Sequence, residues 1–295
     1  MPAWQAKTLP DAVDLARPCA PFAYMFDTAR HATKMQRSHG AAHVVMGPRG
    51  LIDLAQQGSA KAQLPRMTKG LPEIVFLNTS GGLASGDRLR FAVDLRDGTR
   101  ALATTQTAER AYRANDAPAR AQVALTVGKG GWLDWLPQET ILYDNARLER
   151  DTQVDLTGDA GCMLLEILVL GRLAMGETIK HLHLRDRRVV RRDGRVIHHD
   201  ALALDDAALP RLNDPAMLNG ARVMASMAVI APDAADLLAR ARAVLDEPGV
   251  TAAASALPGR LCLRILSHDN WPLRRQVNRL LGALRPDPLP RIWQV

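Results

Sequence analysis

Cysteine, aromatic residues and long apolar runs are all scarce in this 295-residue chain. Its three cysteines, Cys19, Cys162 and Cys262, are odd in number and far apart, which argues against a disulfide framework and against a local thiolate metal site. Such usage indicates a reducing cytoplasm. The longest apolar stretch, residues 162–170, contains Glu166 and is too short to span a bilayer, and no leader-like pattern opens the sequence. We therefore expect neither export nor membrane insertion.

Basic residues outnumber acidic ones: the chain has 38 Lys and Arg against 31 Asp and Glu, and its formal net charge is +7. A basic chain attracts nucleic acid or acidic protein surfaces. The basic residues concentrate in residues 185–195 and at Arg274, Arg275 and Arg279, but aromatic residues make up only 4% and rarely interleave with them. We interpret these runs as a solvated hairpin and a charged helix face. A basic nucleic-acid-binding β protein stays the alternative.

Alternating and β-branched patterns dominate the middle of the chain. They predict strands at residues 43–46, 51–54, 73–77, 89–95, 101–107, 121–127, 148–156, 162–170, 177–187, 196–204 and 223–230. Turn residues at 47–50, 80–82, 97–98, 129–131 and 193–194 separate them and are typical of hairpins. Short strands at regular spacing indicate a mainly β fold of layered antiparallel or mixed sheets, rather than βαβ units.

The pattern differs at both ends of the chain. Residues 1–40 are rich in proline and weakly periodic, which predicts an irregular entry. After the β-rich body of residues 40–230, helical spacing predicts a helix from Asp233 to Leu245 and another from Asp269 or Asn270 until Pro286. A strand at 261–266 separates them. Residues 231–295 should thus form a helix–strand–helix portion packed on the body.

Familiar catalytic and cofactor motifs are not found. The Gly-rich segment 78–87 lacks the Lys-Ser/Thr ending of a phosphate-binding loop, and a strand pattern follows it instead of a helix, so we interpret it as a tight turn. His181 and His183 share one face of a predicted strand, but local spacing supplies no third metal ligand. We therefore predict no catalytic residue and no tightly bound cofactor.

Carboxylates inside apolar segments are harder to explain. Glu166 lies within a continuous apolar run, where an unpaired carboxylate is costly, so it implies an ion pair, a water-lined passage or a cation site. Arg172 is the nearest partner along the sequence, and Glu177 enlarges the acidic set. Glu139 and Asp144 lie in a second apolar segment, where they are either an acid/base pair of a hydrolase or acceptors for backbone groups.

Six segments in a fixed order carry a resemblance to a known family. They are residues 58–66 (GSAKAQLPR), 76–87 (FLNTSGGLASGD), 104–114 (TTQTAERAYRA), 135–146 (WLPQETILYDNA), 165–177 (LEILVLGRLAMGE) and 290–293 (PRIW). Over roughly residues 35–295, the chain resembles the UreD/UreH family of urease accessory proteins. The resemblance implies a β-rich fold with C-terminal helices. It also implies a scaffold, not an enzyme, that joins UreF and the GTPase UreG to the urease apoprotein so that nickel reaches its active site.

The resemblance further implies an internal, water-filled passage for nickel. An ion in transit needs oxygen ligands that bind weakly enough to release it, and carboxylates and water supply these. The candidate lining residues are Glu139, Asp144, Glu166, Glu177 and Asp87. Nickel is then a cargo and not a resident cofactor, GTP hydrolysis belongs to the partner UreG, and neither nucleic acid nor membrane is an expected partner.

Overall fold

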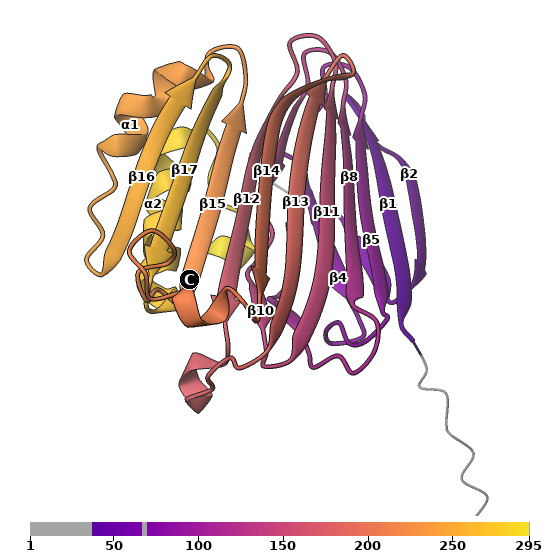
Figure 1. Cartoon of the computed structure of the whole chain (residues 1–295). Helices are drawn as coiled ribbons and strands as arrows, with labels where there is room; N and C mark the ends of the chain where they lie inside the picture. The colour runs from indigo at the N-terminus through magenta and orange to yellow at the C-terminus, as the bar shows by residue number, and fades with distance from the viewer. Residues whose placement is uncertain (1–36, 67–69, 295) are drawn as a thin grey trace, which may run out of the picture. The chain divides into compact units, whose positions relative to one another are not determined.

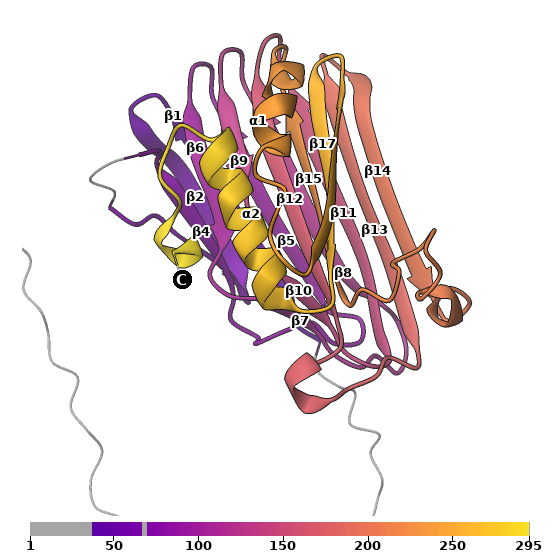
Figure 2. The ribbon, with the colours of Figure 1, turned by 90° about the vertical axis from the view of Figure 1, so that its left-hand side faces the viewer.

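Two stacked β-sheets, with helices on the outer face of one of them, make up the computed structural model, which describes residues 37–66 and 70–294 (Figures 1 and 2). These residues belong to one compact unit. The fold is mainly β with mixed sheets and a small C-terminal helical portion, as predicted.

Sheet A has seven strands in the order β14-β13-β11-β8-β5-β1-β2. Their bounds are β1 (His39–Gly47), β2 (Gly50–Gly58), β5 (Arg88–Leu95), β8 (Ala119–Val127), β11 (Ala146–Leu156), β13 (Leu182–Arg192) and β14 (Arg195–Asp205). The pairs β1–β2 and β13–β14 are antiparallel hairpins, and the other neighbours are parallel.

Sheet B has ten strands, most of them along the path β16-β17-β15-β12-β9-β6-β4-β3, while β10 pairs with β12 and β7 with β10. Their bounds are β3 (Ala60–Gln63), β4 (Glu73–Asn78), β6 (Arg100–Thr105), β7 (Glu109–Ala111), β9 (Trp132–Trp135), β10 (Thr140–Leu142), β12 (Gly161–Leu170), β15 (Val223–Ile230), β16 (Val250–Leu257) and β17 (Arg260–Ser267). The strands from β4 to β12 run parallel, and those from β12 to β16 antiparallel.

The chain winds from one sheet to the other. In order, β4, β6, β9 and β12 lie in sheet B, while β5, β8, β11 and β13 lie in sheet A. A parallel pair needs a crossover between its strands, and here a strand of the opposite sheet provides it. The prediction of hairpins at residues 80–82, 97–98 and 129–131 is therefore wrong. Those turn residues do reverse the chain, but the next strand joins the other layer instead of pairing with the last one.

One apolar core fills the space between the two sheets. Phe91 of β5 and Phe76 of β4 stack with their ring centroids 4.6 Å apart, and Val44, Leu125 and Leu133 pack into the same core. On the strands of sheet A this core receives every second side chain, because successive residues of a strand point to opposite faces. The outward residues of the same strands are mostly polar.

A second core lies between sheet B and the helices (Figure 2). Helix α2 (Asn270–Leu284) buries Leu273, Val277 and Leu280 there, and Asp269 caps it by accepting a hydrogen bond from the backbone NH of Trp271 at 2.9 Å. All residues of β12 are buried, because its two faces belong to the two cores. Among the described residues, no helix is both long and apolar enough to cross a membrane.

The C-terminal portion contains one more strand than predicted. The structure has a 3-10 helix (Ala234–Leu237) and a short α1 (Leu238–Arg242), then β16, β17 and α2. β16 was not predicted because its alanine-rich sequence favours helix, and it is pairing with β17 that makes it a strand. The helix expected from Asp233 to Leu245 is shorter and is not capped by the Asp233 side chain.

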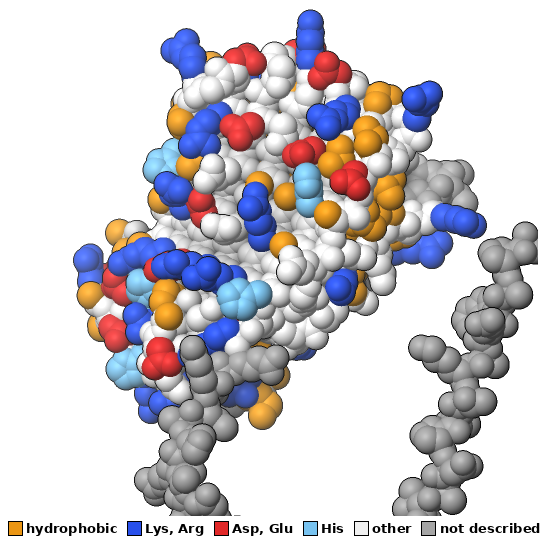
Figure 3. All heavy atoms as spheres, turned by 90° about the vertical axis from the view of Figure 1, so that its right-hand side faces the viewer, with side chains coloured by type: hydrophobic (Ala, Val, Ile, Leu, Met, Phe, Trp, Pro, Cys, Tyr) orange, Lys and Arg blue, Asp and Glu red, His pale blue; other side chains and the backbone are white. Residues whose placement is uncertain are grey.

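The outer face of sheet A mixes charges of both signs (Figure 3). Arg187 pairs with Asp151 at 2.8 Å and Arg185 with Asp205 at 3.3 Å, whereas Arg188, on the opposite face of β13, is buried between the sheets. The basic run at residues 185–195 therefore forms a two-faced hairpin, in which the outward Arg185 and Arg187 have acidic partners and Arg191 donates to the amide oxygen of Gln153.

Candidate functional site

A cluster of charged side chains lies between the two sheets, where the core is otherwise apolar. Arg150 of β11 and Asp186 and Arg188 of β13 point inward from sheet A, and Glu166 of β12 meets them from sheet B. Each is at most 8% exposed. Buried charges are tolerated only with partners, so the hydrogen bonds of this cluster determine whether it is stable.

Arg150 is the centre of the cluster. Its Nε and Nη2 donate to the two oxygens of Asp186 at 3.1 and 2.9 Å, and its Nη1 donates to Glu166 Oε1 at 2.5 Å and to Thr140 Oγ1 at 3.0 Å. The planar guanidinium thus grips one carboxylate bidentately and a second by one bond. Because Asp186 belongs to sheet A and Glu166 to sheet B, these bonds tie the sheets together.

Arg188 continues the alternation of charge. Its Nη2 lies 3.0 Å from Asp200 Oδ2 on β14 and 3.7 Å from Asp186 Oδ2, and its Nη1 donates to the hydroxyl of Ser226 on β15. Arg264 of β17 also binds Asp200. Three guanidinium groups, those of Arg150, Arg188 and Arg264, therefore balance three carboxylates, those of Glu166, Asp186 and Asp200.

The two carboxylates around Arg150 differ in their affinity for protons. Burial raises the pKa of Glu166 to about 7, although the charge of Arg150 acts in the opposite direction. Burial also favours the protonated form of Asp186, but the charge and the two hydrogen bonds of Arg150 outweigh it, and the pKa of Asp186 is lowered. Burial therefore favours the protonated form of Glu166, whereas Arg150 favours the ionised form of Asp186.

A cavity of about 140 Å³ lies beside this cluster. Polar groups of Glu166, Arg188, Asp200, Ser226 and Arg264 line it. The Nε of Arg188 is buried and has no hydrogen-bond partner in the described part of the chain. A cavity that is polar and of this volume can hold several water molecules, and water would supply the missing acceptor.

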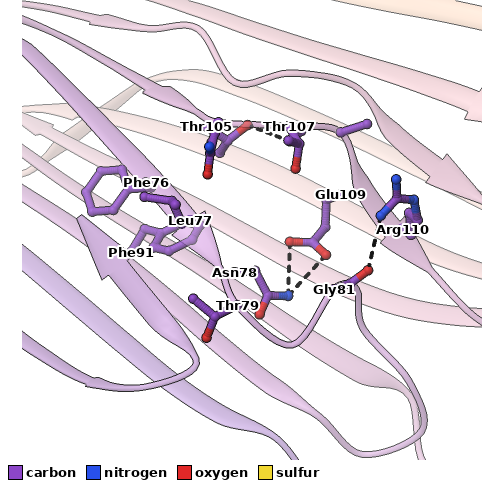
Figure 4. Close-up of a pocket in the computed structure, with 12 residues that line it drawn as sticks. Phe76, Leu77, Asn78, Thr79, Gly81, Phe91, Thr105, Thr107, Glu109 and Arg110 are labelled. Atoms are coloured by element: carbon purple, nitrogen blue, oxygen red, sulfur yellow. Dashed lines mark hydrogen bonds between the residues drawn. The ribbon is translucent and has the colours of Figure 1, made fainter. Parts of the chain in front are cut away.

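A second pocket, of about 160 Å³, contains Glu109 of β7 (Figure 4). The amide of Asn78 donates to both carboxylate oxygens of Glu109, at 3.1 and 3.3 Å, and Phe76 and Phe91 lie to one side of the pocket. Burial raises the pKa of Glu109 to about 7, and the hydrogen bond from Asn78 only partly offsets this effect. Glu109 is therefore a second carboxylate that titrates near neutral pH.

One strand joins the two pockets. Thr140 of β10 is the register partner of Glu109 on β7, and its hydroxyl accepts a hydrogen bond from Arg150 Nη1. Glu109, Thr140, Arg150 and Glu166 thus form what we call the inter-sheet polar line. It begins at the pocket of Glu109 and ends at the cavity beside Glu166.

Of the five carboxylates predicted to contact nickel, only Glu166 belongs to this line. Asp87 supports the Gly-rich turn, where its two oxygens accept from the backbone NH groups of Ser38 at 2.7 Å and Ala84 at 2.8 Å. The turn leads into β5 and not into a helix, which agrees with its interpretation as a connection rather than a phosphate-binding loop.

Glu139 lies on the helix side of sheet B. Its carboxylate accepts from Asn270 Nδ2 at 3.2 Å and from Arg274 Nη1 at 3.3 Å, both on α2. Arg274 also places its guanidinium 4.8 Å from the ring centre of Trp293, which is fully buried. Glu139 therefore helps to anchor α2 and the C-terminal residues to the sheet.

Asp144 and Glu177 are brought together at another place. Glu177 Oε1 accepts from the backbone NH of Asp144 at 3.4 Å, and Asp144 Oδ1 accepts from the backbone NH of Lys180 at 2.7 Å. Arg172 binds Glu177 at 3.0 Å, so the expectation that Arg172 neutralises Glu166 is wrong; Arg150 does so instead. The sequence neighbour points into a different group because Glu166 faces the space between the sheets.

The described residues contain no cluster of side chains suited to stable metal coordination. Among them, no three His, Cys, Asp or Glu side chains are close enough together to hold a metal ion. The ring of His181 pairs with Asp206 at 3.0 Å, that of His183 lies 3.7 Å from Glu149, and the backbone NH of His181 donates to Asp144.

Comparison with known proteins matches this two-sheet chain to one family over nearly its whole described length. The model of the UreD urease accessory protein family matches residues 38–294. The chain belongs to the UreD family. A urease accessory protein UreD of Paracoccus denitrificans is 73% identical to it over 271 residues, which cover 92% of this chain and 97% of the relative.

More distant UreD proteins match over a similar length. One from Cereibacter sphaeroides is 55% identical over 264 residues, covering 88% of this chain and 96% of the relative. One from Xanthobacter autotrophicus is 42% identical over 270 residues, covering 90% and 93%. The prediction of a urease accessory protein is thereby confirmed.

Most charged residues of this UreD-family site were not predicted from the sequence as site residues, namely Arg150, Asp186, Arg188, Asp200, Arg264 and Glu109. Arg150 and Asp186 can be recognised in the sequence as inward-facing, because each lies two residues from an apolar inward residue of the same strand, Leu148 and Leu184 respectively. A charge at an inward position predicts a buried pair. Glu109 carries no such signal, since β7 has only three residues and its pocket is made by segments distant in sequence.

Proposed function

We propose that this UreD-family chain serves urease maturation in the cytoplasm as a scaffold that joins UreF and UreG to the urease apoprotein, and that nickel passes along its inter-sheet polar line. The observation that carries the passage is a line of polar groups that runs from the half-buried Glu109 through the buried Thr140 and Arg150 to Glu166 and its adjacent cavity. Such groups are costly to bury and add nothing that apolar packing would not supply, so a role in transport accounts for them.

The chemistry of the line suits a cation in transit. Carboxylate, hydroxyl and water oxygens bind Ni(II) without the tight hold of several thiolates or imidazoles. Glu166 would be the main protein ligand, with water in the adjacent cavity completing the coordination. Too few protein ligands are gathered within the described residues to trap the ion, which is what delivery to another protein demands.

The other candidate carboxylates have less access to such an ion. Glu139, Asp144, Glu177 and Asp87 each accept hydrogen bonds from nearby protein groups and lie away from the inter-sheet polar line. The route proposed here leaves these four carboxylates out, and Glu139 is the most useful comparison because it is also partly buried but faces α2.

GTP hydrolysis is assigned to UreG and not to this chain. The Gly-rich turn at residues 78–87 has Asp87 as its own anion, bonded to the backbone NH groups of Ser38 and Ala84. A phosphate would compete with this carboxylate, and no helix begins at the turn to stabilise the phosphate's charge.

The passage is tested by Glu166→Gln, with Glu139→Gln as the matched control. Urease would be purified from cells that co-produce the accessory proteins, and its nickel content measured by elemental mass spectrometry. We expect Glu166→Gln to lower the nickel per urease several-fold, because an amide is a much weaker ligand for Ni(II) than a carboxylate. Glu139→Gln should leave it near the wild-type value. Full nickel loading by a Glu166→Gln chain of normal abundance would contradict the passage.

A further inference from the structure

Arg150 occupies the position that a passing cation would need. Its guanidinium sits between Glu166 and Asp186 and donates to both, and Thr140 supplies a hydroxyl oxygen on the same side. We propose that Arg150 is the gate of the passage, a tethered cation that competes with the travelling divalent ion for these two carboxylates. The inference rests on the function proposed above and adds a residue that controls access to it.

The geometry makes the competition direct. The two carboxylates come from opposite sheets and converge on one guanidinium, at 2.5 Å for Glu166 and 2.9 Å for Asp186. An ion that replaced the guanidinium would meet the same oxygens, together with Thr140 Oγ1. Carboxylate and hydroxyl oxygens are acceptable ligands for Ni(II), whose remaining positions water would fill.

The charge balance points the same way. With Arg150 in place, three cations and three anions of the cluster cancel. Without its charge, Glu166, Asp186 and Asp200 in their ionised forms exceed Arg188 and Arg264 by one negative charge, so the buried Glu166 must either take up a proton or pair with another cation. The cluster then attracts a cation instead of excluding it.

Arg150 can yield its place only by moving. A guanidinium keeps its proton under all physiological conditions, so the gate cannot open by discharge. The cavity of about 140 Å³ beside Glu166 offers volume for the entering ion and its water. Opening therefore means that Arg150 swings away from Glu166 and Asp186, and the ion takes up the released carboxylates.

The test measures the affinity of the purified full-length chain for nickel chloride by isothermal titration calorimetry near neutral pH. Arg150→Gln should create a site for one Ni(II) ion per chain, at least about tenfold tighter than any binding by the wild type, because two buried carboxylates lose their counter-ion. The matched control is Arg187→Gln, which removes an exposed arginine from an ion pair on the outer face of sheet A. It should bind nickel like the wild type.

A second change locates the new site. The double variant Arg150→Gln, Glu166→Gln should lose the gained affinity, because it lacks one of the two carboxylates. If Arg150→Gln is folded by circular dichroism and gains no affinity, the gate is refuted. If it does not fold, Arg150→Met decides the question: its apolar side chain fills much of the same space without a charge, so a gain of about tenfold supports the gate and no gain refutes it.

These outcomes are separate from those of the proposed function. Normal nickel loading by Glu166→Gln, together with a new site in Arg150→Gln, would refute the passage and leave the competition between Arg150 and the cation standing. Reduced loading by Glu166→Gln, with no new site in a folded Arg150→Gln, would refute the gate and leave the passage.

Discussion

At the scale of single residues, the interior of this protein holds more charge than stability requires. Replacing a buried ion-pair network by apolar side chains of similar size is often neutral or stabilising, whereas removing one member is costly. Arg150 makes four hydrogen bonds within such a network, and Glu166 and Glu109 have raised pKa values because burial disfavours their ionised forms. The cost of keeping these carboxylates inside is itself an argument for a functional role.

Glu109 makes this cost measurable as a function of pH. Its pKa is about 7 in the folded chain, against 4.5 for a glutamate fully exposed to water. Since the folded pKa is the higher one, folding loses stability as the pH rises from about 4.5 to about 7, and the loss, up to about 3 kcal/mol, is complete above that range. Glu109→Gln has no such loss. We expect its advantage over the wild type in the free energy of urea unfolding to grow from about pH 5 to about pH 8.5; parallel curves would contradict the raised pKa.

At the scale of elements, strand alternation was the reliable part of the sequence signal. It located most strands, and the unbroken apolar run of β12 indicated correctly that both faces are buried. Two features of the fold could not be predicted from strand alternation. Whether a turn leads to a neighbouring strand or to the opposite sheet depends on packing that no local residue encodes, and β16 is a strand only because β17 lies beside it. For the same reason Glu166 was located in the core, but its partner Arg150, on the other sheet, was not.

The two-sided burial of β12 predicts an unusual response to substitution. Leu164 faces the core between the sheets, and its neighbour Leu165 faces the helices. Changing either to alanine should lower the free energy of unfolding by about 2–5 kcal/mol, because each leaves a cavity in a packed core. On β11, Leu148→Ala should cost a similar amount but Arg147→Ala, at an exposed position, under about 0.5 kcal/mol. Urea unfolding measures all four; a tolerated Leu165→Ala would place the helices elsewhere.

At the scale of the whole described unit, the winding of the chain between sheets makes its two cores interdependent. Every parallel pair in sheet A is separated along the chain by one or two strands of sheet B, and the pair of β1 and β5 by β2 of sheet A as well. The parallel strands of sheet A are therefore linked to one another through sheet B. β12 contributes side chains to both cores, so loss of the helix-side core exposes half of a strand on which the other core depends.

Cys162 reports on this coupling. It is fully buried between the sheets, and burial raises the pKa of its thiol to about 12, so it should resist alkylation until the core opens. Leu280→Ala alters only the helix-side core, at a cost of about 2–5 kcal/mol. If the cores unfold together, this change should lower the urea concentration at which iodoacetamide labels Cys162, read by peptide mass mapping, by as much as it lowers the midpoint seen by circular dichroism. An unchanged labelling midpoint would show that the sheet core survives without the helices.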